Sequence, residues 1–262
     1  MIDLFRRHGR PLVVGHRGAA AIGPENTLDA FRAAAALGVD VVEFDVLGLE
    51  RGPLVVAHSD RLEEMTHGAA QGRVGDRTLG ELREIAPALP TLDEALAWFA
   101  AEAPRVGIQV DLKGRDRVDE VATLLERHGV AERTVVSSVH PDVLWAVARV
   151  SPRIGLGLTY PEDRLGVSRR RYMWPLVRTG LAALRASVPS RLPGMLRRAD
   201  AGALMLQHRL VTRAAVERAH ALGVPVLAWT VDDPADVKRV SEAGVDGVIT
   251  NDPRILLATL RP

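Results

Sequence analysis

The stretch VVEFDV, residues 41–46, reads as a buried strand, yet it carries Glu43 and Asp45 two positions apart. Residues i and i+2 of a strand point to the same side, so the two carboxylates lie next to each other. Burying two like charges costs on the order of several kcal/mol unless a positive group offsets them. The stretch therefore predicts a cationic partner, either a side chain or a bound ion.

On both sides of this stretch, apolar runs of strand length alternate with helical segments. The predicted strands are 12–16, 41–47, 105–112, 134–138, 153–158, 202–208, 225–231 and 244–250. The predicted helices include 25–38, 91–102, 116–129, 141–150 and 212–222, with two more beginning at Asp233-Pro234 and Asp252-Pro253. Asn26 is the predicted N-cap of the first helix, and Thr91 with Glu94 forms a capping box.

The short run LVVAH, residues 54–58, follows the second strand too closely for a parallel crossover, so it is predicted to return antiparallel. Eight strand–helix units in about 250 residues match a (β/α)8 TIM barrel. An open, doubly wound sheet is the alternative, because alternation alone does not show closure. We predict a single barrel domain over 1–262, with an insertion at about 59–90 and an extended segment at about 161–199 after the fifth strand.

Composition excludes several classes of protein. The 262 residues are 47% hydrophobic, which suffices for one sizeable core, and 34 basic against 33 acidic residues give no global field that would attract nucleic acid. The absence of cysteine excludes disulfides and thiolate metal sites. No apolar run approaches the roughly 20 residues needed to span a bilayer, and no signal-peptide core precedes the first strand. These features predict a cytoplasmic location.

Polar side chains gather at or near the ends of the predicted strands, with Glu43 and Asp45 in the second half of strand 41–47, and these strand ends share one rim in a barrel. They are His16, Arg17, Glu43, Asp45, His58, Asp111, Lys113, His208 and Trp229. A single strand-end Asp often caps a helix, and a single His is often structural. The joint occurrence of so many such residues indicates an active site.

The three carboxylates Glu43, Asp45 and Asp111 form a hard, all-oxygen ligand set that suits Mg²⁺ or Ca²⁺. Zinc fits less well, because the sequence has neither cysteine nor a pair of histidines four residues apart in one helix. A divalent cation held there could polarise a phosphoryl oxygen.

Three basic residues complete the predicted chemistry. Arg17 suits a bidentate grip on a phosphate group. His16 and His58 can supply a general acid and a general base near neutral pH. Which of them plays which role is not fixed by the sequence, although we favour His16 as the acid.

The motifs GHRG, PENTLDAF, VEFDV, VVAHSD, DLK and AWTVDD with AGVDGVITNDP resemble the glycerophosphodiester phosphodiesterase family from about residue 12 to 256. The resemblance implies a metal-dependent TIM barrel with a small insertion. It implies catalytic roles for His16 and His58, metal ligation by Glu43, Asp45 and Asp111, phosphate contacts by Arg17 and Lys113, and a substrate pocket lined by Trp229.

The predicted reaction is cleavage of glycerophosphodiesters to glycerol 3-phosphate and an alcohol. The alternative is a lysophospholipase D acting on lysophospholipids at a membrane, and an inert barrel used as a binding module is less favoured. Lys113 could be a Schiff-base lysine of an aldolase only if the His-Arg-Gly motif were ignored. Two departures from the family pattern stand near the site: Asp111 replaces the usual Glu, and His-Ser-Asp at 58–60 replaces His-Asp.

The segment after the fifth strand is strongly basic. Its arginines are Arg164, Arg169, Arg170, Arg171, Arg178, Arg185, Arg191, Arg197 and Arg198. The simpler interpretation is a lengthened barrel helix with its apolar face on the barrel. The alternative is a cap over the rim whose residues 164–198 contact an anionic membrane at the inner face or the acyl tail of a lysophospholipid.

Overall fold

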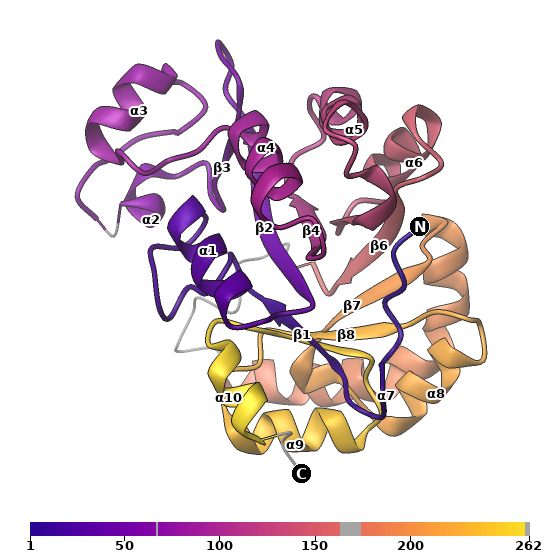
Figure 1. Ribbon diagram of the computed structural model, residues 1–262. Coiled ribbons are helices and arrows are strands. Elements are labelled where there is room, and N and C mark those ends of the chain that lie inside the picture. Colours follow the sequence, from indigo (N-terminus) through magenta and orange to yellow (C-terminus); the bar gives the residue numbers. More distant parts are fainter. Residues whose placement is uncertain (67, 163–173, 260–262) are drawn as a thin grey trace.

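In the computed structural model, eight parallel strands close into a barrel (Figure 1). The first strand, β1 (Leu12–Gly15), pairs with β2 (Val41–Gly48) on one side and with the last, β9 (Gly247–Thr250), on the other. Between them run β4 (Gly107–Leu112), β5 (Thr134–Ser138), β6 (Gly155–Tyr160), β7 (Ala203–Gln207) and β8 (Val226–Trp229). The structure describes residues 1–66, 68–162 and 174–259. The predicted TIM barrel is confirmed, and the open-sheet alternative is wrong because β1 joins both ends.

Helices surround the barrel and follow its strands (Figure 1). They are α1 (Leu28–Ala36), α4 (Leu92–Glu102), α5 (Val118–Arg127), α6 (Pro141–Val150), α7 (Trp174–Ala199), α8 (Arg213–His220), α9 (Pro234–Glu242) and α10 (Pro253–Thr259). The capping box at Thr91 and Glu94 is confirmed. The predicted N-cap of α1 was wrong by one residue: Thr27 caps the helix, since its hydroxyl accepts from the Ala30 N–H.

The predicted antiparallel return is confirmed. β3 (Leu54–Val56) pairs with the end of β2, with Val56 opposite Val46. Beyond it the insertion holds two short helices, α2 (Leu62–Met65) and α3 (Leu79–Ile85), which lie to one side of the barrel (Figure 1). A separate apolar cluster supports this insertion: Leu49, Val55, Ala57, Leu62, Val74, Leu82 and Leu89.

The barrel core is apolar at its amino-terminal end. Leu12, Val14 and Leu227 point inward there and pack with Leu4 from the segment before β1. Between the barrel and its helices, the rings of Phe31 on α1, Phe44 on β2 and Phe99 on α4 pack against one another, with Phe44 and Phe99 stacked. Because apolar side chains fill the barrel at the amino-terminal ends of its strands, the polar strand residues lie together toward the carboxyl-terminal ends, where TIM barrels have their active sites.

The described part of α7 behaves as a barrel helix. Its residues Val188, Leu192 and Leu196 are buried in the main core, and Leu181 and Leu184 pack against it. The apolar face of residues 180–199 is therefore occupied by the barrel. Residues 163–173, with most of the predicted basic run, lie outside the described residues. Within the described ranges, no helix is both long and apolar enough to cross a membrane.

Candidate active site

Strand register brings the predicted carboxylates together. β2 and β4 align so that Asp45 lies opposite Asp111, and Glu43 lies opposite Gln109. Glu43 is 4% exposed, Asp45 is fully buried and Asp111 is 6% exposed. Three acidic side chains on two adjacent strands are thus largely removed from water.

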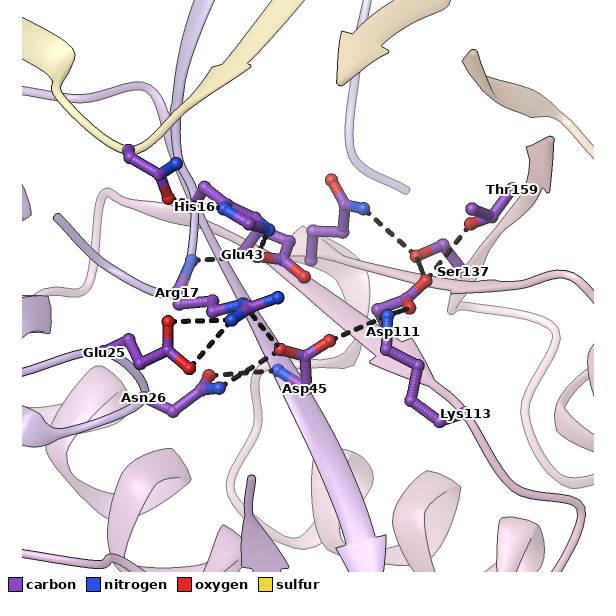
Figure 2. Close-up of polar contacts among 12 residues, drawn as sticks. His16, Arg17, Glu25, Asn26, Glu43, Asp45, Asp111, Lys113, Ser137 and Thr159 are labelled. Atoms are coloured by element: carbon purple, nitrogen blue, oxygen red, sulfur yellow. Dashed lines mark hydrogen bonds and ion pairs between the residues drawn. The ribbon is translucent and has the colours of Figure 1, made fainter. Parts of the chain in front are cut away.

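Two basic side chains of the protein, Arg17 and Lys113, contact this carboxylate cluster (Figure 2). The Lys113 ammonium contacts Asp111 and lies 2.9 Å from Asp45 Oδ1. On the other side, Arg17 Nε lies 3.2 Å from Asp45 Oδ2. The same guanidinium donates to both oxygens of Glu25, at 2.8 and 2.7 Å. Arg17 and Lys113 therefore supply part of the positive charge that two buried carboxylates in one strand require.

The pKa values of Asp45 and Glu43 are shifted in opposite directions. Burial opposes ionisation of Asp45, but Lys113 and other nearby cations hold its pKa well below the ordinary range. Burial, together with repulsion from Asp45 and Asp111, raises the pKa of Glu43 well above its usual value. Although burial opposes it, the carboxylates raise the pKa of Lys113. Two cations, Arg17 and Lys113, thus contact a cluster of three carboxylates, and the raised pKa falls on Glu43.

Asp111 is fixed by hydroxyl groups from the next two strands. The Ser137 hydroxyl donates to Asp111 Oδ1 at 2.6 Å, and the Thr159 hydroxyl lies 3.1 Å from the same oxygen. Gln109 Nε2 donates to Ser137 Oγ at 3.1 Å and so supports this arrangement. Hydrogen bonds to Oδ1 thus hold Asp111 against β5 and β6, while its Oδ2 contacts Lys113.

Asn26 and Glu25 take part in the site, although the sequence predicted Asn26 only as a helix cap and gave Glu25 no role. The buried Asn26 adopts a left-handed backbone with φ +59°. Its amide donates to Asp45 Oδ2 at 3.1 Å and accepts from the Asp45 backbone N–H at 3.2 Å. Both residues belong to the motif PENT, residues 24–27, which is part of the family resemblance.

His16 follows β1 and is held by the opposite end of the chain. Its Nδ1 lies 2.7 Å from Asn251 Oδ1, and its Nε2 lies 3.9 Å from Glu43 Oε2. Burial, with the charge of Arg17, lowers the pKa of His16 to about 4. The imidazole is therefore neutral at pH 7 in this arrangement, a form in which one ring nitrogen can accept a proton.

His58 follows β3 and stands where three cavities meet. Burial lowers its pKa, and the nearby Asp45 carboxylate opposes that shift. The Asp60 of the His-Ser-Asp sequence is engaged elsewhere: it accepts from the Gly75 N–H at 2.7 Å and pairs with Arg73. In this chain Asp60 thus stabilises the insertion.

Most of the predicted site residues surround a cavity of about 120 Å³. Its walls include Glu43, Asp111, both histidines, Arg17 and Lys113, together with Gln109, Thr159, Met205 and Trp229. The Trp229 indole N–H donates to the Met205 carbonyl at 3.0 Å, which fixes the ring as a wall of the cavity. A larger cavity of about 500 Å³ shares Arg17 and His58 and extends between the start of α1 and the insertion.

His208 was a further candidate at a strand end. It follows β7 but begins a short 3₁₀ helix, and its Nδ1 lies 3.3 Å from Asp236 on α9. The backbone carbonyl of His208 accepts from Arg239. His208 does not line the cavity of about 120 Å³, so the geometry gives it a structural contact instead of a place at the candidate site.

The donor chemistry of the cluster fits a hard divalent cation. Glu43, Asp45 and Asp111 offer only oxygen ligands, and a divalent cation would reduce the repulsion that Asp45 and Asp111 exert on Glu43. In the described part of the chain, however, no three acidic or histidine side chains are already arranged as a metal site. Lys113 lies between two of the carboxylates, so its partly exposed side chain would have to move for an ion to bind there.

Comparison with known proteins gives the family. The model of the glycerophosphoryl diester phosphodiesterase family matches residues 16–255. The chain belongs to this family. A Mycobacterium tuberculosis protein named "Probable glycerophosphodiester phosphodiesterase 1" is 31% identical over 273 residues, covering 94% of this chain and 90% of the relative. A glycerophosphodiester phosphodiesterase from Caldanaerobacter subterraneus subsp. tengcongensis is 28% identical over 268 residues, covering 96% and 98%.

Solved structures agree on the fold of this phosphodiesterase family. The crystal structure of a glycerophosphodiester phosphodiesterase from Thermotoga maritima superposes with a TM-score of 0.73 at 24% identity, covering 97% of this chain and 100% of that one. The predicted enzyme class, a phosphoric diester hydrolase, is confirmed by the family. The family is generally dependent on a divalent cation.

Proposed function

We propose that this phosphodiesterase hydrolyses glycerophosphodiesters to glycerol 3-phosphate and an alcohol. The observation that carries the proposal is the wall of the 120 Å³ cavity, where two histidines, Arg17 and Lys113 face one space beside a carboxylate cluster. That set can bind an anionic diester and move two protons. The names of the relatives support the glycerophosphodiester as the substrate class.

The proposed mechanism uses the residues of the cavity directly. Arg17 and Lys113 bind the phosphodiester and reduce the repulsion that an attacking oxygen would meet. One of His16 and His58 removes a proton from the nucleophile, which is water or the neighbouring glycerol hydroxyl. The other protonates the departing alkoxide, so that no free strong base leaves the site.

Glu43, Asp45 and Asp111 would hold the divalent cation, Mg²⁺ or Ca²⁺. When bound, the ion supplies positive charge to the phosphoryl oxygens and to the carboxylates around it. Asn26, Ser137 and Thr159 already fix two of these carboxylates by hydrogen bonds, so these oxygens are oriented before any ion arrives.

The two connected cavities suggest how the substrate lies. We place the glycerol phosphate half in the small cavity against Trp229 and Thr159. The alcohol half then extends past His58 into the 500 Å³ cavity, whose wall includes Met65 and Leu89 from the insertion. Residues of the insertion would thus select among alcohol head groups.

The experiment is a panel of glycerophosphodiesters and lysophospholipids, incubated with and without Mg²⁺ or Ca²⁺ and followed by phosphorus NMR. We expect glycerol 3-phosphate from the glycerophosphodiesters in the presence of a cation. His16→Ala and His58→Ala serve as inactive controls, and Asp236→Asn serves as an active one. Failure to cleave any glycerophosphodiester under these conditions would overturn the proposal.

The lysophospholipase D alternative receives no support from the comparisons with known proteins. Peripheral contact of residues 164–198 with an anionic membrane is a separate hypothesis. Because the apolar face of residues 180–199 packs on the barrel, this contact would depend on Arg169, Arg170 and Arg171, which lie outside the described residues. Sedimentation with vesicles tests this hypothesis. Salt-sensitive pelleting with anionic vesicles that is lost on replacing the three arginines by Gln would support it, and no pelleting at low salt would remove it.

A further inference from the structure

A chain of hydrogen bonds runs behind the catalytic cavity and ends at His16. Asp232 follows β8, Asn251 follows β9 and His16 follows β1, and these three strands are neighbours in the barrel. Asn251 Nδ2 donates to Asp232 Oδ2 at 2.6 Å, and Asn251 Oδ1 lies 2.7 Å from His16 Nδ1. The chain therefore joins a carboxylate outside the cavity to a histidine that lines it.

The directions of these bonds are fixed by their chemistry. A carboxylate can only accept, and Asp232 Oδ1 already accepts from the Asn251 backbone N–H at 2.8 Å and from the Thr250 hydroxyl at 3.1 Å. The Asn251 amide must therefore turn its NH₂ to Asp232 and its oxygen to His16. An amide oxygen also only accepts, so His16 has to donate from Nδ1. The proton of the neutral ring is then on Nδ1, and Nε2 carries the lone pair.

We propose that Asp232 and Asn251 are positioning residues that hold His16 in the Nδ1-protonated tautomer, so that Nε2 accepts the proton of the nucleophile. The inference rests on the proposed function for its catalytic meaning. As the nucleophile's O–H proton passes to Nε2, its oxygen bonds phosphorus and the bond from phosphorus to the alcohol oxygen breaks. That oxygen takes the extra proton of His58 in its imidazolium form, which leaves His58 neutral. His16 is then the base and His58 the acid, the reverse of the assignment favoured from the sequence.

Exchanging the two polar groups tests the direction of the chain. In Asp232→Asn, the new amide oxygen keeps the bonds to Asn251 N–H and Thr250, and its NH₂ faces the Asn251 side chain. Asn251 then turns its oxygen toward position 232 and its NH₂ toward His16, which favours the tautomer protonated on Nε2. We expect kcat to fall about 10- to 100-fold with KM little changed.

The double variant Asp232→Asn/Asn251→Asp restores every donor and acceptor direction, because the Asn at 232 donates to the carboxylate at 251 and that carboxylate accepts from His16. We expect it to recover kcat to within a few-fold of the unmodified enzyme. Asp236→Asn is the matched control, since it removes a carboxylate that lies beside His208 and outside the cavity. It should leave kcat unchanged.

A second measurement does not depend on turnover. Nitrogen-15 NMR of the ring nitrogens of His16, assigned by their loss in His16→Gln, should show a protonated Nδ1 and an unprotonated Nε2 in the unmodified protein. This outcome is independent of whether the substrate class is correct. The opposite tautomer, wild-type kcat in Asp232→Asn, or a double variant no more active than Asp232→Asn would each overturn the proposal.

Discussion

Replacing Asn26 should destabilise the protein more than a surface change would, because this residue connects the backbone before α1 to the carboxylate cluster. Asn26 is buried, makes two hydrogen bonds to Asp45 and adopts a left-handed backbone. Asn26→Ala removes both hydrogen bonds and places a side chain with no local polar group in that backbone conformation. Asn26→Gly removes the same hydrogen bonds but tolerates the backbone.

The expected magnitude follows from these contacts. The bond from the amide to the ionised Asp45 is worth about 1.5 kcal/mol and the bond from the backbone N–H about 1 kcal/mol. We take the lower end for the charged bond because the distances of 3.1 and 3.2 Å are long for such bonds. The left-handed backbone adds about 1 kcal/mol for alanine. We therefore expect a loss of about 3.5 kcal/mol for Asn26→Ala and about 2.5 kcal/mol for Asn26→Gly.

Urea unfolding followed by tryptophan fluorescence measures both variants against the unmodified protein, and equal slopes would show that the native states are equally compact. Asn26→Ala within about 1 kcal/mol of the unmodified protein would refute the contribution of the hydrogen bonds. Equal losses for the two variants would refute the contribution of the backbone.

Further predictions concern the site itself. Chelation should abolish turnover, and Mg²⁺ or Ca²⁺ should restore it. Either ion should also raise the melting temperature of the ion-free protein, because it offsets repulsion among Glu43, Asp45 and Asp111. Full activity after chelation, or an unchanged melting temperature, would contradict the metal assignment. His16→Ala and His58→Ala should each lower kcat about 100-fold or more without unfolding the protein, whereas His208→Ala should stay close to wild-type kcat; the reverse order would contradict the assigned roles. Ser137→Ala, which frees Asp111 Oδ1 from its short hydrogen bond, should weaken cation binding about 10- to 100-fold; isothermal titration with unchanged affinity would show that the hydroxyl does not orient this ligand.

The barrel could be predicted from the sequence because its signals are local. The predicted strand 134–138 and helix 141–150 have the bounds found in the structure, and the return of β3 followed from its short distance to β2. Closure was predicted only from the number of strand–helix units and from the family resemblance, because the pairing of β1 with β9 spans nearly the whole chain. No local pattern reports a contact of that separation.

The gathering of the predicted site residues around one cavity could be anticipated, because they lie in or just after the carboxyl-terminal halves of strands that share a rim. Their partners could not. Asn251 and Asp232 were part of a recognised motif, but their value lies in a contact to His16 from the other end of the sequence. The place of Lys113 between Asp45 and Asp111 also depends on the register of β2 against β4, which the sequence does not specify.

The central claim is that the cavity between His16 and His58 breaks the phosphorus–oxygen bond of a glycerophosphodiester on the alcohol side. Turnover of a glycerophosphodiester in ¹⁸O-labelled water with Mg²⁺ or Ca²⁺, read by phosphorus NMR and mass spectrometry, tests it most directly. We predict glycerol 3-phosphate with one ¹⁸O on its phosphate and an unlabelled alcohol, whether water attacks first or opens a cyclic intermediate, and formation of product about 100-fold slower or more in His16→Ala. Label in the alcohol, or glycerol 3-phosphate formed at the same rate by His16→Ala, would contradict the account.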